Sequence, residues 1–193
     1  MDEQAKQWLA AYRRGDLDAL GRLVEHWRRP LYAFIYHQLR GRGDAEDIFQ
    51  ETWIRAVRGL DAFRGDRALS WLFRIARNLV VDEFRRRCRE DTAAPRDGAE
   101  TSVPAGVETH ADGRPGADAA AVERETAERV AAAVRSLPDE QREVFLLRTE
   151  GDISFREIAR MQGVPLNTAL GRMHYATRRL RELLRDEYDA LRS

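Results

Sequence analysis

Residues 88 to 121 contain no aromatic side chain, and this gap divides the chain into two parts that we expect to be folded. Twelve of the sixteen aromatic residues lie between Trp8 and Phe84, and the other four lie between Phe145 and Tyr188. The gap also holds three prolines and four glycines, with two valines as its only larger apolar residues. Such a segment cannot bury enough apolar surface to offset the entropy lost on ordering, so we expect a flexible linker.

The charge of the chain is divided in the same way. The whole chain is neutral, with 33 basic and 33 acidic residues. Ten acidic and three basic residues lie between Glu90 and Glu128, so this segment carries −7 and the flanking parts together carry +7. Cationic modules on either side of an anionic linker favour binding to a polyanion. Lys6 is the only lysine, and arginine suits contacts to phosphates, although a GC-rich genome would produce the same bias.

Several classes of protein are excluded or disfavoured by what the sequence lacks. The single cysteine, Cys88, allows neither an intramolecular disulfide nor a cysteine-based zinc site, and we interpret it as an inert thiol rather than a redox sensor. No apolar run is long enough to span a bilayer and the N-terminus is polar, which predicts a cytoplasmic protein without a membrane partner. Motifs for binding nucleotides or catalytic zinc are missing, so we expect neither an enzyme nor a cofactor.

Acidic residues gather at one point, Asp44 to Glu51, and raise the alternative of a metal-dependent enzyme. Acids in the first turn of a helix usually interact with the helix macrodipole. Histidine and cysteine residues do not accompany them at metal-binding spacing, so we expect no metal site there.

The first part predicts a helical bundle. Helices are expected over residues 2–14, from Leu17 to Leu39 with a break or kink at Pro30, from 45 to about 58, and over 68–87. Asp16 and Asp44 are the predicted N-caps of the second and third helices. The predicted inward residues of the third and fourth helices are Ile48, Trp53, Ile54, Val57, Leu72, Ile75, Ala76, Leu79 and Val80.

The second part is also predicted to be helical. Helices are expected over 119–134, from Pro138 onward, from a capping box at Ser154–Glu157 to Gly163, and from Pro165 onward. The last helix has a predicted buried stripe of Leu170, Met173, Ala176, Leu180, Leu183 and Leu184. The predicted fold class is therefore all-α: a domain over 1–89, an acidic linker over 90–121 and a second domain over 122–193.

The last two helices have the pattern of a helix-turn-helix. A capped helix, a glycine turn and a second helix with a basic end would present a rod to the DNA major groove. Small or polar residues near the start of the last helix could approach base edges, and the arginines after them could hold phosphates. These residues are Asn167, Thr168 and Gly171, followed by Arg172, Arg178, Arg179 and Arg181. The alternative is a solvated arginine face.

The fourth predicted helix combines arginines with aromatic residues. Arg74, Arg77 and Asn78 lie within little more than one turn, and Trp71 and Phe73 lie just before them. Aromatic residues among arginines suit unpaired bases, which can stack or be held in a pocket. Either Trp71 or Phe73 must belong to the core on helical spacing, so the preceding loop Phe63-Arg64-Gly65 is the better candidate for contacting bases.

These two sets of residues, in this order, resemble bacterial RNA polymerase sigma factors of the extracytoplasmic-function (ECF) type. The resemblance covers about residues 17–89 and 130–185, matching regions two and four of that family. The segments that carry it are GDAEDIFQETWIRAVRGLDAFRG with SWLFRIARNLVVDEFRR, and SLPDEQREVFLL with SFREIARMQGV and RMHYATRRLRELL. The helix-turn-helix alone would be weak evidence for this family, because many repressors share it.

The resemblance implies three binding surfaces and no catalytic residue. Asp44, Asp47, Gln50 and Glu51 would dock on the beta-prime clamp of core RNA polymerase, and region four would meet the beta flap. Phe63, Arg64, Gly65, Arg74, Arg77 and Asn78 would engage the non-template single strand of the minus-ten element. Asn167, Thr168, Gly171, Arg172, Tyr175, Arg178 and Arg179 would contact the minus-thirty-five duplex. Because factors of this kind often have an anti-sigma partner, an anti-sigma factor is a further candidate partner.

Two features depart from the family pattern. A GTVKSR-like run usually begins the recognition helix, but here Leu170 and Gly171 stand at its lysine and serine positions, while Arg172 is retained. The linker is also long and acidic. About 34 flexible residues reach about 30 Å, whereas sites two helical turns apart are separated by about 70 Å. We therefore expect the polymerase, rather than the free protein, to set the spacing of the domains.

Two rival functions remain at this point. A stand-alone helix-turn-helix regulator would act on duplex DNA without polymerase. A protein-interaction bundle would bind no nucleic acid and would not support promoter-dependent transcription.

Overall fold

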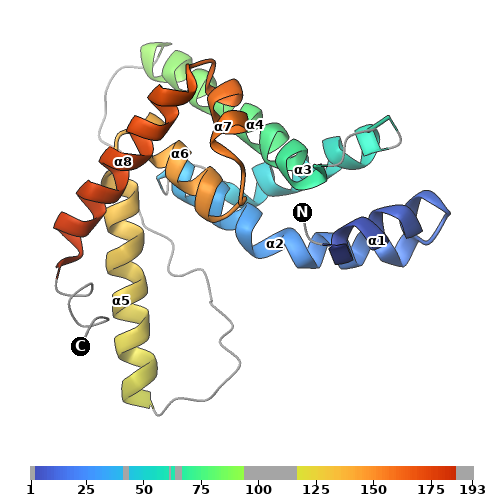
Figure 1. The fold of residues 1–193 in the computed structure, drawn as a ribbon, viewed down its shortest axis with the longest axis horizontal. Helices are drawn as coiled ribbons and strands as arrows, with labels where there is room; N and C mark the ends of the chain where they lie inside the picture. Colours follow the sequence, from blue (N-terminus) through green and yellow to red (C-terminus); the bar gives the residue numbers. More distant parts are fainter. Residues whose placement is uncertain (1–2, 41–43, 61, 64–66, 94–116, 186–193) are drawn as a thin grey trace.

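The computed structural model describes residues 3–40, 44–60, 62–63, 67–93 and 117–185, and within these ranges the chain is all-α. The helices are α1 (Glu3–Arg13), α2 (Leu17–Leu39), α3 (Ala45–Leu60), α4 (Ala68–Ala93), α5 (Ala117–Ser136), α6 (Asp139–Thr149), α7 (Phe155–Gln162) and α8 (Leu166–Leu183). The predicted fold class is confirmed. The first four helices form an N-terminal module, and the other four form a C-terminal module (Figure 1).

The N-terminal module is a bundle built on α2, which contacts α1, α3 and α4. Its centre contains Leu31, Phe34 and Ile35 of α2, together with Phe73 of α4, all at 0% exposure. The rings of Phe34 and Phe73 lie 5.2 Å apart. Since α2 continues as one helix through Pro30, the predicted break does not occur. The missing amide hydrogen bond is tolerated where both flanking turns carry apolar residues packed in the core.

The predicted N-caps are confirmed. The carboxylate of Asp16 accepts a hydrogen bond from the Ala19 amide at 3.2 Å. The carboxylate of Asp44 accepts bonds from the Glu46 and Asp47 amides at 2.9 and 3.3 Å. These side chains satisfy amides that the first turn leaves unpaired, which explains why α2 and α3 begin there.

In helix α3 the predicted inward residue Ile48 is buried, but the rest of the buried face differs from the one expected. The buried residues of α3 also include Phe49, Thr52, Ala56 and Leu60, whereas Ile54 is 44% exposed. Residues spaced by four share one face, and small side chains on that face let α3 approach its neighbours closely. The Thr52 hydroxyl donates to the Ile48 carbonyl at 2.6 Å, so this polar side chain is satisfied when buried.

Helix α8 also differs from expectation, because Leu170 and Leu183 are exposed at 42% and 38%. The buried residues of α8 are Ala169, Ala176 and Leu180. The predicted stripe was too wide, since α8 lies on the surface of a small module and has only one narrow face to bury. Leu170 is therefore available at the surface beside the predicted DNA contacts.

Both ends of the segment assigned to the linker are helical. Helix α4 continues to Ala93 and α5 begins at Ala117, so residues 90–93 and 117–121 extend the flanking helices. The rest of the predicted linker, 94–116, lies outside the described residues, as do Arg64 and Gly65.

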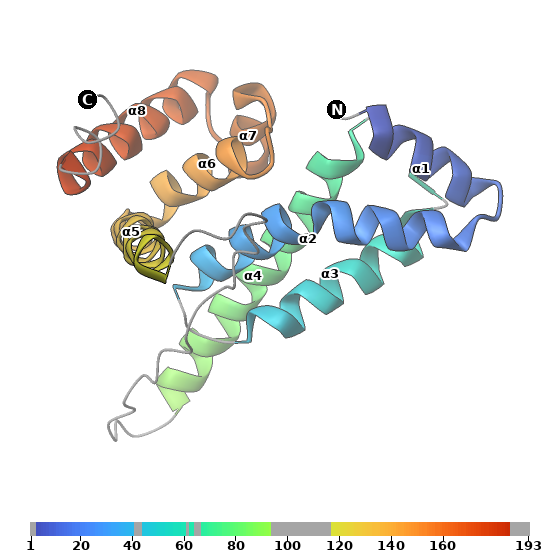
Figure 2. The same ribbon diagram turned by 90° about the horizontal axis from the view of Figure 1, so that it is seen from below.

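The two modules pack directly against each other, with α2 touching both α5 and α6. Figure 2 shows α6 beside α2 and α8 on the far side of α6, and Figure 1 shows α5 projecting away from both bundles. Modules in contact do not have the separation that two promoter elements would need, in line with the expected role of the polymerase in setting it.

Candidate nucleic-acid and polymerase interface

The helix-turn-helix is formed by α7 and α8. The Ser154 hydroxyl accepts a hydrogen bond from the Glu157 amide at 3.4 Å and caps α7, and Gly163 ends α7 with φ +66°. The turn leads to Pro165, after which α8 begins. Asn167 and Thr168 in the first turn of α8 are exposed, as contacts to base edges would require.

The basic end of α8 is exposed and loosely paired. Tyr175 is 52% exposed, and the guanidinium of Arg178 lies 5.4 Å from the centre of its ring. Arg178 and Arg179 pair with Glu182 at 3.9 and 3.4 Å. Exposed ion pairs of this kind contribute about 0–1 kcal/mol, so a phosphate could replace Glu182 at little cost.

Arg172 has a different environment from the arginines that follow it. It is half-buried and donates a hydrogen bond to the side-chain oxygen of Gln162 at 2.6 Å. The side chain of Arg172, which is predicted to contact the minus-thirty-five element, is therefore held by the neighbouring helix α7.

Gly171, near the start of α8, has a backbone conformation that does not require glycine. No atom lies within 4 Å of a Cβ added at Gly171, and its φ lies in the ordinary range, unlike that of Gly163. We expect Gly171→Ala to raise the free energy of unfolding by about 1 kcal/mol, because alanine loses less backbone entropy in a helix. Urea unfolding followed by far-UV circular dichroism would measure this. Gly163→Ala is the contrasting variant, and it should be destabilising because of its positive φ.

The predicted single-strand surface on α4 is only partly accessible. Arg74 and Asn78 are exposed, but Arg77 is half-buried and paired with Glu143 of α6. Phe73 is buried in the core, as expected for one of the two aromatic residues. Trp71 is half-buried, and its ring stacks on that of Phe63 at 4.8 Å.

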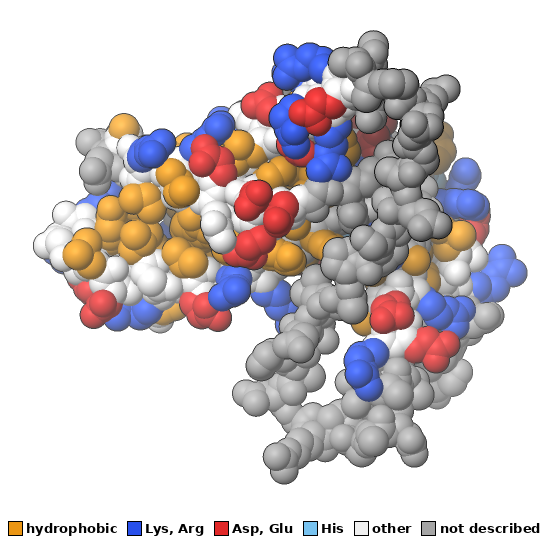
Figure 3. Space-filling model, turned by 180° about the vertical axis from the view of Figure 1, so that it is seen from behind, with side chains coloured by type: hydrophobic (Ala, Val, Ile, Leu, Met, Phe, Trp, Pro, Cys, Tyr) orange, Lys and Arg blue, Asp and Glu red, His pale blue; other side chains and the backbone are white. Residues whose placement is uncertain are grey.

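The acidic surface at the start of α3 faces solvent. Asp44, Asp47 and Gln50 are exposed, and the Gln50 side chain donates to Glu46 at 3.2 Å. Glu51 is half-buried and pairs with Arg55 at 2.7 Å. On the reverse face of the molecule, acidic side chains lie next to a hydrophobic area (Figure 3). A surface of this composition suits a partner helix that carries both arginines and apolar residues.

A groove of about 800 Å³ lies between the modules. The N-terminal module contributes Phe63, Trp71 and Arg74, and the C-terminal module contributes Phe155, Arg160 and Leu170. The predicted minus-ten residues Phe63 and Arg74 therefore face α7 and the start of α8 across this groove.

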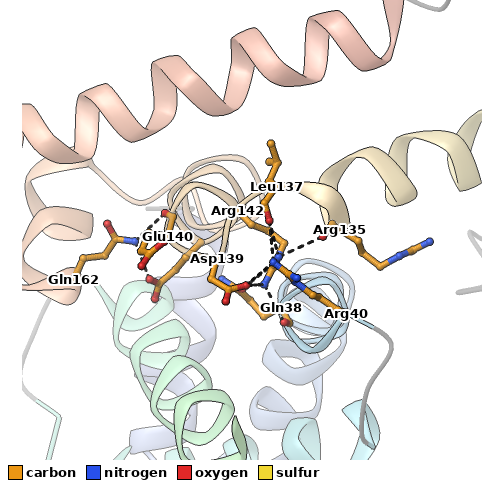
Figure 4. Close-up of polar contacts among 9 residues, drawn as sticks. Gln38, Arg40, Arg135, Leu137, Asp139, Glu140, Arg142 and Gln162 are labelled. Carbon is orange, nitrogen blue, oxygen red and sulfur yellow. Dashed lines mark hydrogen bonds and ion pairs between the residues drawn. The ribbon is translucent and has the colours of Figure 1, made fainter. Parts of the chain in front are cut away.

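Sequence reasoning missed Arg142, which is fully buried where the modules meet. Arg142 donates to the Leu137 carbonyl at 2.9 Å, to Asp139 at 2.5 Å, and across the interface to the side-chain oxygen of Gln38 at 3.3 Å (Figure 4). Beside it, Arg40 donates to Asp139 at 2.8 Å. Nothing in the local pattern distinguishes Arg142 from a solvated helix arginine, because Gln38, its partner across the interface, lies on another helix 104 residues earlier.

His37 lies at the same interface, and the neutral form of its ring is favoured there. Burial lowers the pKa of His37 from 6.5 to about 4, and the positive charges of Arg135 and Arg142 contribute to this decrease. Its Nδ1 is buried without a hydrogen-bond partner among the described residues.

Acidification should therefore lower the free energy of unfolding of the protein. Unfolding lets His37 take up a proton, so stability that is fully present above pH 6.5 is lost as the pH falls toward 4. We expect the urea midpoint of the wild-type protein to fall more steeply across this range than that of His37→Gln, which cannot be protonated. Equal slopes for the two proteins would contradict this prediction.

Two further findings bear on the class of protein. In the part of the chain that the structure describes, no three histidine, cysteine or acidic side chains gather as metal ligands would. Likewise, no helix among the described residues has both the length and the hydropathy that a membrane crossing requires.

Comparison with known proteins assigns both modules. Sigma-70 region 2 matches residues 23–90, and Sigma-70 region 4 matches residues 127–180. The ECF RNA polymerase sigma factor SigW of Bacillus subtilis (strain 168) is 30% identical over 187 residues, which are 96% of this chain and 100% of SigW. The chain belongs to the ECF RNA polymerase sigma factors. It therefore acts in transcription initiation through core RNA polymerase and promoter DNA.

Solved structures agree with this assignment. The sigma factor RpoE from Bartonella quintana, in complex with the anti-sigma factor NepR, has a TM-score of 0.67 and 25% identity, covering 86% of this chain and 96% of RpoE. CnrH, in complex with the cytosolic domain of CnrY, has a TM-score of 0.57 and 25% identity, and the match covers 95% of this chain and 99% of CnrH. Hereafter region 2 denotes α1–α4 and region 4 denotes α5–α8. A stand-alone helix-turn-helix regulator is not favoured, because region 2 would have no role in it.

Proposed function

We propose that this sigma factor uses three separate surfaces to bring core polymerase to a promoter and open it. Exposed Asp44, Asp47 and Gln50 on α3, with Glu51 beside them, dock on the beta-prime clamp of the polymerase. The observation that supports the two DNA surfaces most directly is that α4 and α8 each present exposed polar side chains next to exposed arginines. That combination suits base contacts positioned by phosphate contacts.

The α4 surface is proposed to hold the non-template strand of the minus-ten element. Arg74, Arg77 and Asn78 would contact its backbone and bases, with Phe63, Arg64 and Gly65 beside them. The stacked pair of Phe63 and Trp71 lines the groove beside Arg74 and would stack with a base that has left the duplex. Arg77 can take part only after it leaves Glu143.

The start of α8 is proposed to contact the minus-thirty-five element in the major groove, with region 4 held near the beta flap. Asn167, Thr168 and Gly171 would face base edges, while Arg172, Tyr175, Arg178 and Arg179 would contact the backbone. Leu170, which stands at the lysine position of the usual family pattern, offers an apolar contact, for example to a thymine methyl group, instead of a charge. The upstream sequence preference should differ accordingly from that of relatives with the usual lysine and serine.

We further propose that residues 1–89 form the polymerase-binding and minus-ten domain, that 122–193 form the minus-thirty-five domain, and that the protein acts by binding and not as an enzyme. Its site of action would be the cytoplasm, where the polymerase and the chromosome are. The similar structure of RpoE contains the anti-sigma factor NepR, which supports an anti-sigma partner for this chain as well.

Run-off transcription tests the proposed function. Core polymerase, with and without the full-length protein, would transcribe genomic fragments, and the start sites would be mapped. We expect a set of start sites that depends on the protein and shares two upstream elements. Transcription that is the same with and without the protein would contradict the proposal.

A further inference from the structure

One carboxylate at the interface of the two regions is connected to arginines of both proposed DNA surfaces, to one directly and to the other through a glutamine. Glu143 of α6 forms an ion pair with Arg77 of α4, although the two residues are 66 positions apart. The side chains of Arg77 and Glu143 are 24% and 13% exposed. An ion pair with so little access to water is screened much less than the exposed pairs on α8.

The second oxygen of Glu143 extends this network into the helix-turn-helix. It accepts a hydrogen bond from the Gln162 amide at 2.7 Å, and the Gln162 oxygen accepts one from Arg172 at 2.6 Å. The Gln162 amide also donates to the Glu140 carbonyl at 3.1 Å, which fixes it against α6 (Figure 4). Glu143 thus holds Arg77 directly and Arg172 through Gln162.

Other ion pairs keep the two regions in this arrangement. Arg67, just before α4, pairs at 2.5 Å with Glu157 of α7, whose side chain is 10% exposed. At the opposite end of the interface, Arg40 pairs with Asp139 at 2.8 Å. Arg67 and Glu157 also line the groove in which Phe63, Trp71 and Arg74 face α7 and α8. In this closed form, region 4 occupies Arg77 and faces part of the proposed minus-ten surface, while Arg74 and Asn78 stay exposed.

We propose that Glu143 is an internal competitor of promoter DNA, which keeps the free sigma factor closed until the polymerase separates its two regions. Carboxylates and phosphates bind a guanidinium in the same way, through charge-assisted hydrogen bonds. DNA therefore cannot use Arg77 or Arg172 without displacing Glu143 or Gln162. This inference rests on the proposed function of α4 and α8, and adds a mechanism that suppresses DNA binding by the free protein.

The test compares Glu143→Gln with Glu140→Gln in the full-length protein. Both variants lose one negative charge from α6, but the Glu140 side chain is exposed and lies outside the network. The probe is a fluorescent duplex carrying the upstream half of a promoter mapped by run-off transcription, together with the single strand of its downstream half. Without polymerase, we expect Glu143→Gln to bind both probes about tenfold more tightly than the wild type, because a larger fraction is open. Glu140→Gln should bind like the wild type.

Small-angle scattering gives an independent readout, since opening should increase the radius of gyration of Glu143→Gln but not that of Glu140→Gln. Equal DNA affinities for the two variants would overturn the proposal. Tighter binding without an increase in size would also overturn it, because the gain would then come from charge alone.

Transcription separates this inference from the function on which it rests. With saturating sigma factor and core polymerase, Glu143→Gln should initiate like the wild type, since the polymerase has already separated the regions. If the wild-type protein supports transcription but Glu143→Gln does not gain free DNA binding, only the internal competition is wrong. If the wild type supports no promoter-dependent transcription, the proposed function fails instead.

Discussion

Replacing Arg142 with methionine should lower the free energy of unfolding of region 4 by about 3 kcal/mol, the largest effect on stability that we expect from one substitution. Methionine fills a similar volume but donates no hydrogen bond. The Leu137 carbonyl and the Gln38 side chain would each lose the bond that Arg142 now donates. The contact between α6 and α2 would weaken for the same reason, so we expect the two regions to separate more readily as well.

Spectroscopy can assign this loss to a region. All four tryptophans (Trp8, Trp27, Trp53 and Trp71) lie in region 2, so tryptophan fluorescence follows its unfolding, whereas far-UV circular dichroism follows both regions. In urea, Arg142→Met should shift the dichroism transition much more than the fluorescence transition.

Arg148→Met on the same helix is the matched control. The side chain of Arg148 is 39% exposed, and its ion pair with Asp152 should contribute less than about 1 kcal/mol. Equal shifts for the two variants would mean that the buried network contributes nothing of its own.

Asp47→Arg should reduce the affinity for core polymerase at least about tenfold, and transcription at limiting protein should fall to the same extent. Asp47 is exposed in the first turn of α3, where an arginine would repel the basic helix that we expect as partner. The fold should be retained, since the helix cap uses the Asp47 amide and the Asp44 carboxylate, both of which the variant keeps. Fluorescence anisotropy with labelled sigma factor would give the affinity.

Asp18→Arg is the control for this experiment. Asp18 is also exposed and lies in the first turn of α2, so the same substitution has the same cost against the helix macrodipole. Normal polymerase binding by Asp18→Arg and weak binding by Asp47→Arg would place the contact on α3. If both variants bind like the wild type, the proposed docking surface is wrong.

Local patterns predicted most of the helices, because their causes are local. Asp16, Asp44 and Ser154 cap helices through amides no more than three residues away, and Gly163 ends α7 through its own φ. Which residues face the core was harder to predict. On α3, Thr52 is buried while Ile54 is exposed, since small residues on one face let the helices approach closely.

In the candidate site, too, the residues were predicted from the sequence but the contacts between distant helices were not. Asn78, Asn167 and Thr168 were identified from residue type and helical position, and Asp47 from the resemblance to sigma factors; all four are exposed. Nothing in the sequence indicated that Arg77 would pair with Glu143, or that Arg172 would be held by Gln162. These contacts join helices that are distant in the chain, and helical periodicity carries no information about which distant faces meet.

By itself, the sequence determined the all-helical class, the two modules, most helix ends and the residue types of the binding surfaces. Only the tertiary structure decided that the modules close on each other, that Arg142 is buried between them, and that Glu143 occupies arginines proposed to contact DNA. The physical reason is the range of the interactions. Caps and amphipathic faces arise within a few residues, whereas a buried ion pair exists only where the packing of whole helices brings two opposite charges together away from water.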